Sequence, residues 1–271
     1  MSALRRSLAV SALVVAAVGS FAHAADPKLP RDGWVSWDVP AFDGAPAWCC
    51  FSWKSRDGAP ASCKLDGHDS SYGTRHDEKT DAVTVYARIT AGKVDRLRVY
   101  SATCPVEART PIEDQAVTSD ESARWLIAQV AAADSDAGAR RRLADDALAA
   151  LSMHRGDLAR DGLIKIGNAD PLGDLRSKAW FWLAMTGASD AESAISAAVR
   201  KDPDDHVREE AVFALSRLPE ERGTRALIAT AEDQSLSREQ RKRAVFWLSQ
   251  SESGAALAYL DRILAATPAT R

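Results

Sequence analysis

The sequence lacks several features that would point to a particular class of protein. Its charges nearly cancel, with 35 Lys and Arg against 38 Asp and Glu, and no long basic block offers the clustered charge of a nucleic-acid groove. Beyond the first 24 residues, no apolar stretch is long enough to cross a membrane. No Gly-x-Ser-x-Gly elbow, phosphate-binding glycine loop or His-Glu-x-x-His helix occurs. We therefore expect no nucleic-acid partner, no membrane insertion of the mature chain, no cofactor, no metal and no enzymatic activity.

Cysteine is scarce and confined to the first half of the chain. The four cysteines are Cys49, Cys50, Cys63 and Cys104. An even number in an exported chain favours disulfides. If Cys49 and Cys50 lie on a strand, their side chains point to opposite faces, so one is expected to bridge Cys63 and the other Cys104. The alternative is a metal or thiol-redox site that adds His68 and His76 to the thiols, although the spacing matches no known zinc pattern well.

The N-terminus has the three parts of a secretory signal peptide. Arg5 and Arg6 give a basic start, an apolar run extends from Leu8 to Val18, and Ala22 and Ala24 form an Ala-x-Ala exit. The apolar run is well under the roughly 20 residues that a transmembrane helix needs. We expect this leader to be removed and the mature protein to be periplasmic or extracellular.

The next part of the chain, residues 25–115, predicts a small β-rich domain. Apolar side chains alternate along Val83 to Ile89 and recur from Val94 to Tyr100, with Gly92 between the two segments. This pattern predicts an antiparallel hairpin, because glycine tolerates the positive φ of a tight turn. Two shorter aromatic strands are expected at 34–39 and 48–53. The polar segment 66–81 is expected to be a loop.

The rest of the chain, residues 116–271, is repetitive. The sequence Ala-Trp-Phe-Trp-Leu at 179–183 returns in similar form at 211–215 and 244–248, and a fainter copy precedes it at 147–151, with offsets of 32, 32 and 33 residues. Such a period, with a second helical segment in each interval, predicts an α-solenoid and a mainly α protein. The expected helix pairs are 137–152 with 157–167, 173–186 with 190–200, 206–217 with 223–233, and 238–250 with 254–266. A helix at 119–133 is expected to be the closing half of an incomplete first unit.

Several helix starts carry the pattern of a capping box, in which a hydroxyl side chain is followed three residues later by Glu or Gln. The pairs are Thr118 with Glu121, Ser189 with Glu192, and Ser237 with Gln240. The repetition of this device supports the helix boundaries.

The repeats share more than their apolar residues. Arg176, Arg208 and Arg241 each stand three residues before the repeated Ala, and the stretch 202–211 closely resembles the Asp-x-x-Val-Arg-x-x-Ala signature of HEAT-like repeats of the PBS-lyase type. The resemblance covers about 119–267, and the layout of leader, small cysteine-containing domain and repeats is similar to that of exported bacterial HEAT-repeat proteins. It implies that the repeat is held together by Arg176, Ala179, Leu183, Arg208, Ala211, Leu215, Arg241, Ala244 and Leu248.

A solenoid of this type implies a surface that recognises a partner, here another protein or an envelope component. The expected contact row, on the second helices of the units, comprises Arg160, Lys165, Glu192, Arg200, Arg225, Glu232 and Tyr259. A competing stripe comprises Trp180, Phe181, Trp182, Phe213, Phe246 and Trp247. We expect those rings to pack, because an internal solenoid helix is surrounded by neighbours. The predicted function is a non-enzymatic exported adaptor, and the resemblance suggests envelope sensing or assembly. The alternative is the metal or thiol-redox protein.

Overall fold

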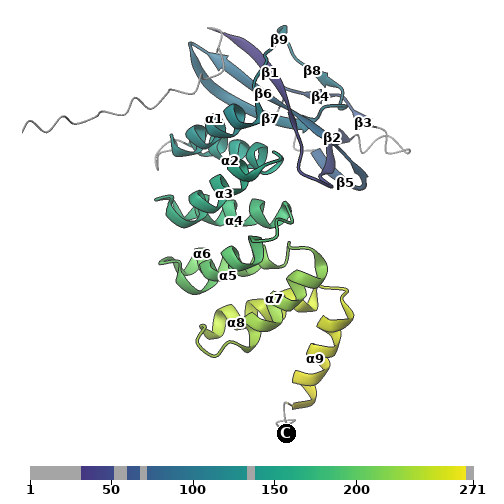
Figure 1. Cartoon of the computed structure of the whole chain (residues 1–271), viewed down its shortest axis with the longest axis vertical. Coiled ribbons are helices and arrows are strands. Elements are labelled where there is room, and N and C mark those ends of the chain that lie inside the picture. The colour runs from purple at the N-terminus through teal and green to yellow at the C-terminus, as the bar shows by residue number, and fades with distance from the viewer. Residues whose placement is uncertain (1–31, 52–59, 68–71, 133–137, 267–271) are drawn as a thin grey trace, which may run out of the picture.

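The computed structural model describes residues 32–51, 60–67, 72–132 and 138–266. The leader expected at the N-terminus lies outside these residues. Within them, strands occupy the first part of the chain and helices the remainder, and the helices stack below the strands in a single column (Figure 1). The mainly α fold with an N-terminal strand-rich part is therefore confirmed.

The larger sheet has the order β7-β6-β1-β9. Its strands are β1 (Gly33–Pro40), β6 (Ala82–Thr90), β7 (Lys93–Ser101) and β9 (Ile112–Asp114). The predicted hairpin is confirmed as β6 and β7, and its turn residues Ala91 and Gly92 have φ of 51° and 71°. Two successive positive φ values are what a two-residue hairpin turn of type I′ requires. The hairpin places Val83, Val85 and Ala87 in the core.

A smaller sheet has the order β3-β2-β5, and a further pair joins β4 to β8. Their bounds are β2 (Pro46–Phe51), β3 (Pro60–Ala61), β4 (Cys63–Lys64), β5 (Tyr72–Lys79) and β8 (Val106–Glu107). The expectation of a loop throughout 66–81 is wrong, because β5 pairs with β2 along most of its length. Its main-chain hydrogen bonds do not depend on apolar side chains, and a polar sequence is common on a strand at the edge of a sheet.

The helices agree with the predicted ranges to within a few residues. They are α1 (Ser119–Ala131), α2 (Gly138–Ser152), α3 (Asp157–Ala169), α4 (Gly173–Met185), α5 (Ala191–Lys201), α6 (Asp205–Leu215), α7 (Glu220–Glu232), α8 (Arg238–Ser249) and α9 (Gly254–Ala266). Capping boxes are confirmed at Thr118 and Ser237. The one expected at Ser189 is wrong: α5 begins after Asp190, and Glu192 instead forms ion pairs with bases on α7.

The predicted pairing of the helices is shifted by one. The most extensive contacts between consecutive helices join α1 to α2, α3 to α4, α5 to α6, and α7 to α8. Helix α1 is therefore the first half of the first pair, and α9 has no following helix among the described residues. The sequence did not distinguish these alternatives because the joints within pairs and between pairs are all short.

Successive pairs stack so that their helices form two layers. Helices α2, α4, α6 and α8 form the even-helix layer, and α1, α3, α5, α7 and α9 form the odd-helix layer. The repeated apolar residues lie between the layers with no exposed surface: Ala179, Leu183, Ala211, Leu215, Ala244 and Leu248. Close approach within the second pair depends on Gly167, because a Cβ there would lie 2.6 Å from the Trp180 ring. The solenoid core is thus built from the residues that repeat.

The larger sheet covers the first end of the solenoid. Helix α2 packs on β7, and one continuous core includes side chains from both. A buried polar chain crosses the same junction: Trp37 Nε1 donates to Ser122 Oγ at 2.7 Å, and Ser122 Oγ lies 2.8 Å from His154 Nε2. The other ring nitrogen, Nδ1, lies 2.8 Å from the carbonyl oxygen of Ala150. These bonds suit a neutral His154 with its proton on Nδ1.

Burial lowers the pKa of His154 from 6.5 to about 4, and the hydrogen bond to Ala150 acts in the opposite direction. The unfolded chain therefore binds a proton on this residue at a pH where the folded protein does not. Between these two pKa values, stability must rise with pH on account of His154. Asp146 has the opposite effect, because burial raises its pKa to about 6 despite the nearby Arg98.

Replacing His154 with Gln should remove the contribution of this residue to the change of the free energy of unfolding with pH. In the wild-type protein, the lowered pKa of His154 should reduce the free energy of unfolding by about 2 kcal/mol near pH 5. This reduction should vanish above about pH 7. Urea unfolding of both proteins from about pH 4 to 7.5 measures the difference between their free energies of unfolding. The contribution of Asp146 is the same in both proteins and cancels from this difference. His206→Gln, at an exposed position on α6, is the control. A difference between wild type and His154→Gln that does not vary with pH would contradict the assignment.

Candidate protein-binding face

The repeated arginines hold the turns between helices. Arg176 on α4 forms two bonds of 2.9 Å with the carboxylate of Asp202, in the turn before α6, and both residues are buried. Its third bond, also 2.9 Å, goes to the carbonyl oxygen of Asp170 in the turn before its own helix. One guanidinium therefore ties together the turns of two successive pairs. A planar fork of this kind matches a carboxylate in a way that lysine cannot.

The equivalent arginines repeat part of this arrangement. Arg208 donates to the carbonyl oxygen of Asp202 at 2.6 Å, and Arg241 donates to that of Leu236 at 2.6 Å. Burial alone would raise the pKa of Asp202, but hydrogen bonds from Arg176 and from the amide of Asp204 outweigh it and hold the pKa below its usual value. The Asp and Arg of the sequence signature thus shape the turn rather than face a ligand.

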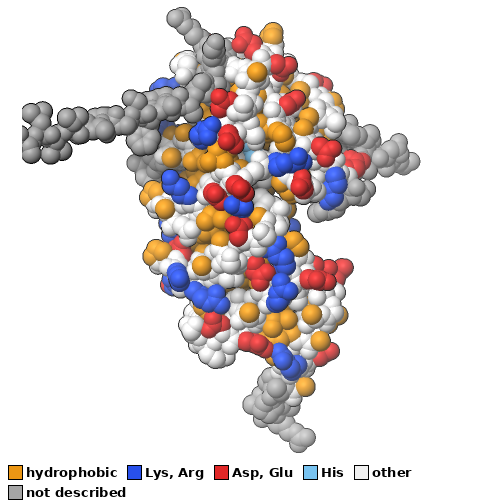
Figure 2. All heavy atoms as spheres, in the orientation of Figure 1, with side chains coloured by type: hydrophobic (Ala, Val, Ile, Leu, Met, Phe, Trp, Pro, Cys, Tyr) orange, Lys and Arg blue, Asp and Glu red, His pale blue; other side chains and the backbone are white. Residues whose placement is uncertain are grey.

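The charged residues that we expected to contact a partner are largely engaged in ion pairs. Arg160 lies 3.3 Å from Asp190, Glu192 3.4 Å from Arg225, and Arg200 3.3 Å from Asp233. Each of these pairs joins one helical pair to the next. The row therefore acts as a set of links along the odd-helix layer, and Figure 2 shows acidic and basic side chains interspersed on the visible face.

Three members of the expected row remain. Glu232 lies 2.6 Å from Arg262 of α9, and Lys165 on α3 is exposed. The expectation that Tyr259 lies on the contact surface is wrong, because it is only 6% exposed and belongs to the core. Since α9 closes against α7 and α8, its one tyrosine turns inward, which the pattern of the row could not reveal.

The aromatic side chains of the even-helix layer form a different row. Trp48 of β2 stacks on Trp182 of α4, with ring centroids 5.4 Å apart, and Phe181 stacks on Phe213 of α6 at 5.7 Å. Phe213 in turn lies 4.8 Å from Trp247 of α8. Contacts of 5.0 Å within α4 and within α8 complete what we call the aromatic row: Trp48, Trp182, Phe181, Phe213, Trp247 and Phe246.

The exposure of these rings differs from our expectation. Trp180 is completely buried, and Trp182 and Trp247 pack against the core while remaining partly exposed, so packing is confirmed for these three residues. The members of the aromatic row are only partly buried, and Phe246 is 54% exposed. The repetition of aromatic residues was visible in the sequence. What was not visible is that Trp48, far away in the chain, extends the row onto the strands.

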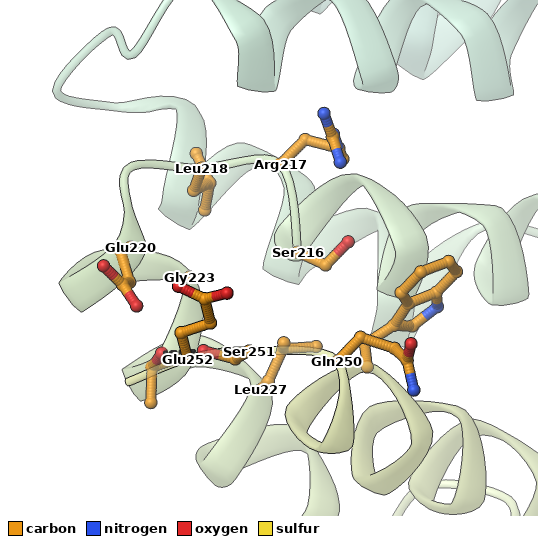
Figure 3. A pocket seen from close by; sticks show the side chains of 11 residues that line it. Ser216, Arg217, Leu218, Glu220, Gly223, Leu227, Gln250, Ser251 and Glu252 are labelled. Atoms are coloured by element: carbon orange, nitrogen blue, oxygen red, sulfur yellow. Dashed lines mark hydrogen bonds between the residues drawn. The ribbon is translucent and has the colours of Figure 1, made fainter. Parts of the chain in front are cut away.

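A cavity of about 550 Å³ lies at the α8 end of the row, between the α6–α7 turn and the α8–α9 turn. Trp247 forms part of its lining. Figure 3 shows Ser216 and Arg217 on one side of this cavity and Gln250, Ser251 and Glu252 on the other. The row therefore leads from the strands to a hollow with polar walls.

The cysteines lie away from this face, in the strands. Cys49 is bonded to Cys104 and Cys50 to Cys63, with Cα atoms 5.5 and 5.3 Å apart. The expected disulfides are therefore present, and each of the adjacent cysteines has a different partner. Among the described residues no cysteine is free, and no group of three or more His, Cys, Asp or Glu is placed to hold a metal. His68 and the side chain of His76 lie outside what is described.

Comparison with known proteins agrees with the architecture. The stacked antiparallel helix pairs make this part of the chain an α-solenoid. Residues 160–249 match the HEAT repeat family, so the solenoid is of the HEAT-like type. No curated protein matches the chain. Repeats of this family commonly mediate protein interactions and are generally not enzymes. The helices described here include none with the length and apolar character of a membrane span.

The bond between Arg176 and Asp202 should carry a large coupling energy. Arg176→Met leaves a buried carboxylate without its partner and should lower the free energy of unfolding by about 3–5 kcal/mol. Asp202→Asn combined with Arg176→Met should cost less than the sum of the single changes. A double-mutant cycle by urea unfolding measures the difference. The matched control is the more exposed pair Arg200 and Asp233, where the coupling should be far smaller. Equal couplings would contradict a special role for the buried pair.

Proposed function

We propose that the protein is an exported scaffold that binds a segment of another protein along the aromatic row. The observation that carries this proposal is the continuity of the row, which joins β2, α4, α6 and α8 through contacts between partly exposed rings. Large, rigid aromatic side chains contribute strongly to protein interfaces, because they bury much apolar area and lose little conformational freedom. A role in envelope sensing or assembly is consistent with such a scaffold.

Ion pairs also join neighbouring even-numbered helices, which are the helices that carry most of the row. Lys178 of α4 lies 2.7 Å from Asp145 of α2, and Arg243 of α8 lies 2.8 Å from Glu209 of α6. These pairs and the buried Arg176 fix successive helices relative to one another. A ligand that binds along the row therefore does not have to order it first, and pre-organisation of this kind favours affinity.

The charged row on the odd-helix layer is the weaker candidate. Its arginines already form ion pairs between helical pairs, with Asp190, Glu192 and Asp233, so a charged partner would have to compete with existing ion pairs. The aromatic row presents apolar surface that no described residue covers completely. The proposal is therefore a non-enzymatic one, in which recognition depends on the shape and apolar character of this face.

Export is supported by two independent features. The N-terminal residues have the form of a signal peptide, and the strands contain two disulfides, which persist mainly in oxidising compartments. The alternative of a thiol-redox or metal-binding protein gains nothing from the strands, because their cysteines are bonded in pairs.

Substitutions in the middle of the aromatic row test the binding proposal. Peptides selected from a displayed random library on the folded protein should bind the double variant Phe181→Ala, Phe213→Ala at least about tenfold more weakly, a loss of about 1.4 kcal/mol or more. Calorimetry or fluorescence anisotropy measures the affinities. Lys165→Ala, on the exposed side of α3, is the matched control and should bind normally.

Two results would contradict this proposal. One is a set of selected peptides that bind the double variant and the wild-type protein equally. The other is a loss of binding in Lys165→Ala with no loss in the aromatic variant, which would assign recognition to the odd-helix layer. Thermal unfolding of each variant separates loss of the surface from loss of the fold.

Export and disulfide formation are tested together by the intact mass of the protein secreted from a host with an oxidising envelope. We expect the mass of a chain that begins at Ala25, lowered by four hydrogens for two disulfides. A retained leader or free thiols titrated in the unfolded protein would oppose the exported form.

A further inference from the structure

The exposed apolar side chains are concentrated at one end of the solenoid. Among the described residues, the large hydrophobic side chains with high exposure are Phe246 at 54%, Leu257 at 57% and Leu264 at 70%. All three belong to α8 and α9. Helix α9 also buries Ala256 and Tyr259 on its other side, so it is apolar nearly all round, a property typical of helices that are covered on every face. Figure 1 shows its second half extending away from α8.

The repeat itself indicates what would cover this surface. Leu257 and Leu264 stand 33 residues after Thr224 and Ala231 of α7. Thr224 is buried and its hydroxyl lies 3.5 Å from that of Ser251, while Ala231 is half-buried. They are covered because α8 and the turn after it pack on α7. No described helix occupies the corresponding place on α9, so its leucines are exposed where their equivalents are not.

Charge at this end differs from charge inside the even-helix layer. Asp145 of α2 faces Lys178 of α4, and Glu209 of α6 faces Arg243 of α8. The residue 33 positions after Glu209 is Lys242 of α8, so a base stands where α2 and α6 present an acid. The side chain of Lys242 is 56% exposed, and its ion pair is a local one of 3.7 Å with Glu239. A helix placed next to α8 would therefore meet a positive charge.

We propose that the terminal flank, formed by Lys242, Phe246, Leu257 and Leu264, binds an amphipathic α-helix of another protein. This helix takes the next place in the even-helix layer. It presents a small residue and a leucine four residues apart, as Ala244 and Leu248 do in α8, and it carries a carboxylate toward Lys242. A second copy of the chain fits less well, because a two-fold contact through this flank would bring Lys242 close to Lys242. The terminal flank shares Phe246 with the aromatic row, but the proposal does not rest on binding along that row.

Two segments of the chain itself supply matched probes. A peptide of residues 204–217, from α6, carries Ala211 and Leu215, with Glu210 at the position immediately before the repeated Ala. A peptide of residues 237–250, from α8, carries Ala244 and Leu248 with Arg243 at that position. Each is constrained as a helix by a lactam on its solvent side, because isolated helices of this length are marginal in water. Fluorescence anisotropy measures the binding of each to the full chain.

The α6 peptide should bind saturably and at least about tenfold more tightly than the α8 peptide. Lys242→Glu should reverse this order, and Leu264→Asp should abolish binding of both. Lys165→Glu, on α3, should change neither. Leu264 is exposed, so its substitution should leave thermal unfolding unchanged, and Leu264→Asp should still bind peptides selected on the aromatic row.

Other outcomes would overturn the proposal. No saturable binding of the α6 peptide up to about 1 mM, or binding that survives Leu264→Asp, would show that the flank does not receive a helix of this kind. Light scattering of the protein alone provides a further test: a dimer that Leu264→Asp converts to a monomer would make a second copy the occupant. If the double variant Phe181→Ala, Phe213→Ala loses binding along the aromatic row but still binds the α6 peptide, the terminal flank binds its helix independently of the middle of the row.

Discussion

A helical pair in this protein cannot bury its apolar residues alone, and the rest of the structure follows from this constraint. Each pair leaves an apolar flank on either side, which only a neighbour can cover. Inside the stack the neighbours are other pairs, and their repeated Ala and Leu residues are completely buried. At the N-terminal end the neighbour is a sheet, since α2 packs on β7. At the other end α9 packs on the last pair, but its own side chains Leu257 and Leu264 remain exposed.

Charged residues help to fix the position of the helical pairs relative to one another. The buried bond from Arg176 to Asp202 joins turns of successive pairs, and exposed ion pairs repeat along both layers. Exposed pairs of this kind contribute little stability individually. Their more evident effect is geometric, because they hold the helices in a fixed relation and leave the aromatic row as the apolar surface of the even-helix layer.

The sequence was sufficient for those parts of the structure that depend on local pattern. The period of the repeat, the hairpin around Gly92 and the capping boxes at Thr118 and Ser237 all arise from residues close together in the chain. The pairing of helices, strand β5 and the inward turn of Tyr259 were not predicted. Each of these depends on contacts between distant residues, such as β2 with β5. The aromatic row falls between the two cases, since its helical members repeat but Trp48 joins them only in three dimensions.

The position of Trp48 has a consequence for how the aromatic row can be used. Its neighbours Cys49 and Cys50 are both bonded to other parts of the strands, so the ring that stacks on Trp182 belongs to a cross-linked anchor. One end of the row is therefore Trp48, whose neighbours in the chain are held by disulfides. The other end lies at α8, where Trp247 lines the cavity. A chain lying along the row would encounter these ends in a set order. The face therefore has polarity, and the binding proposed for it would depend on the direction of the bound segment as well as on its composition.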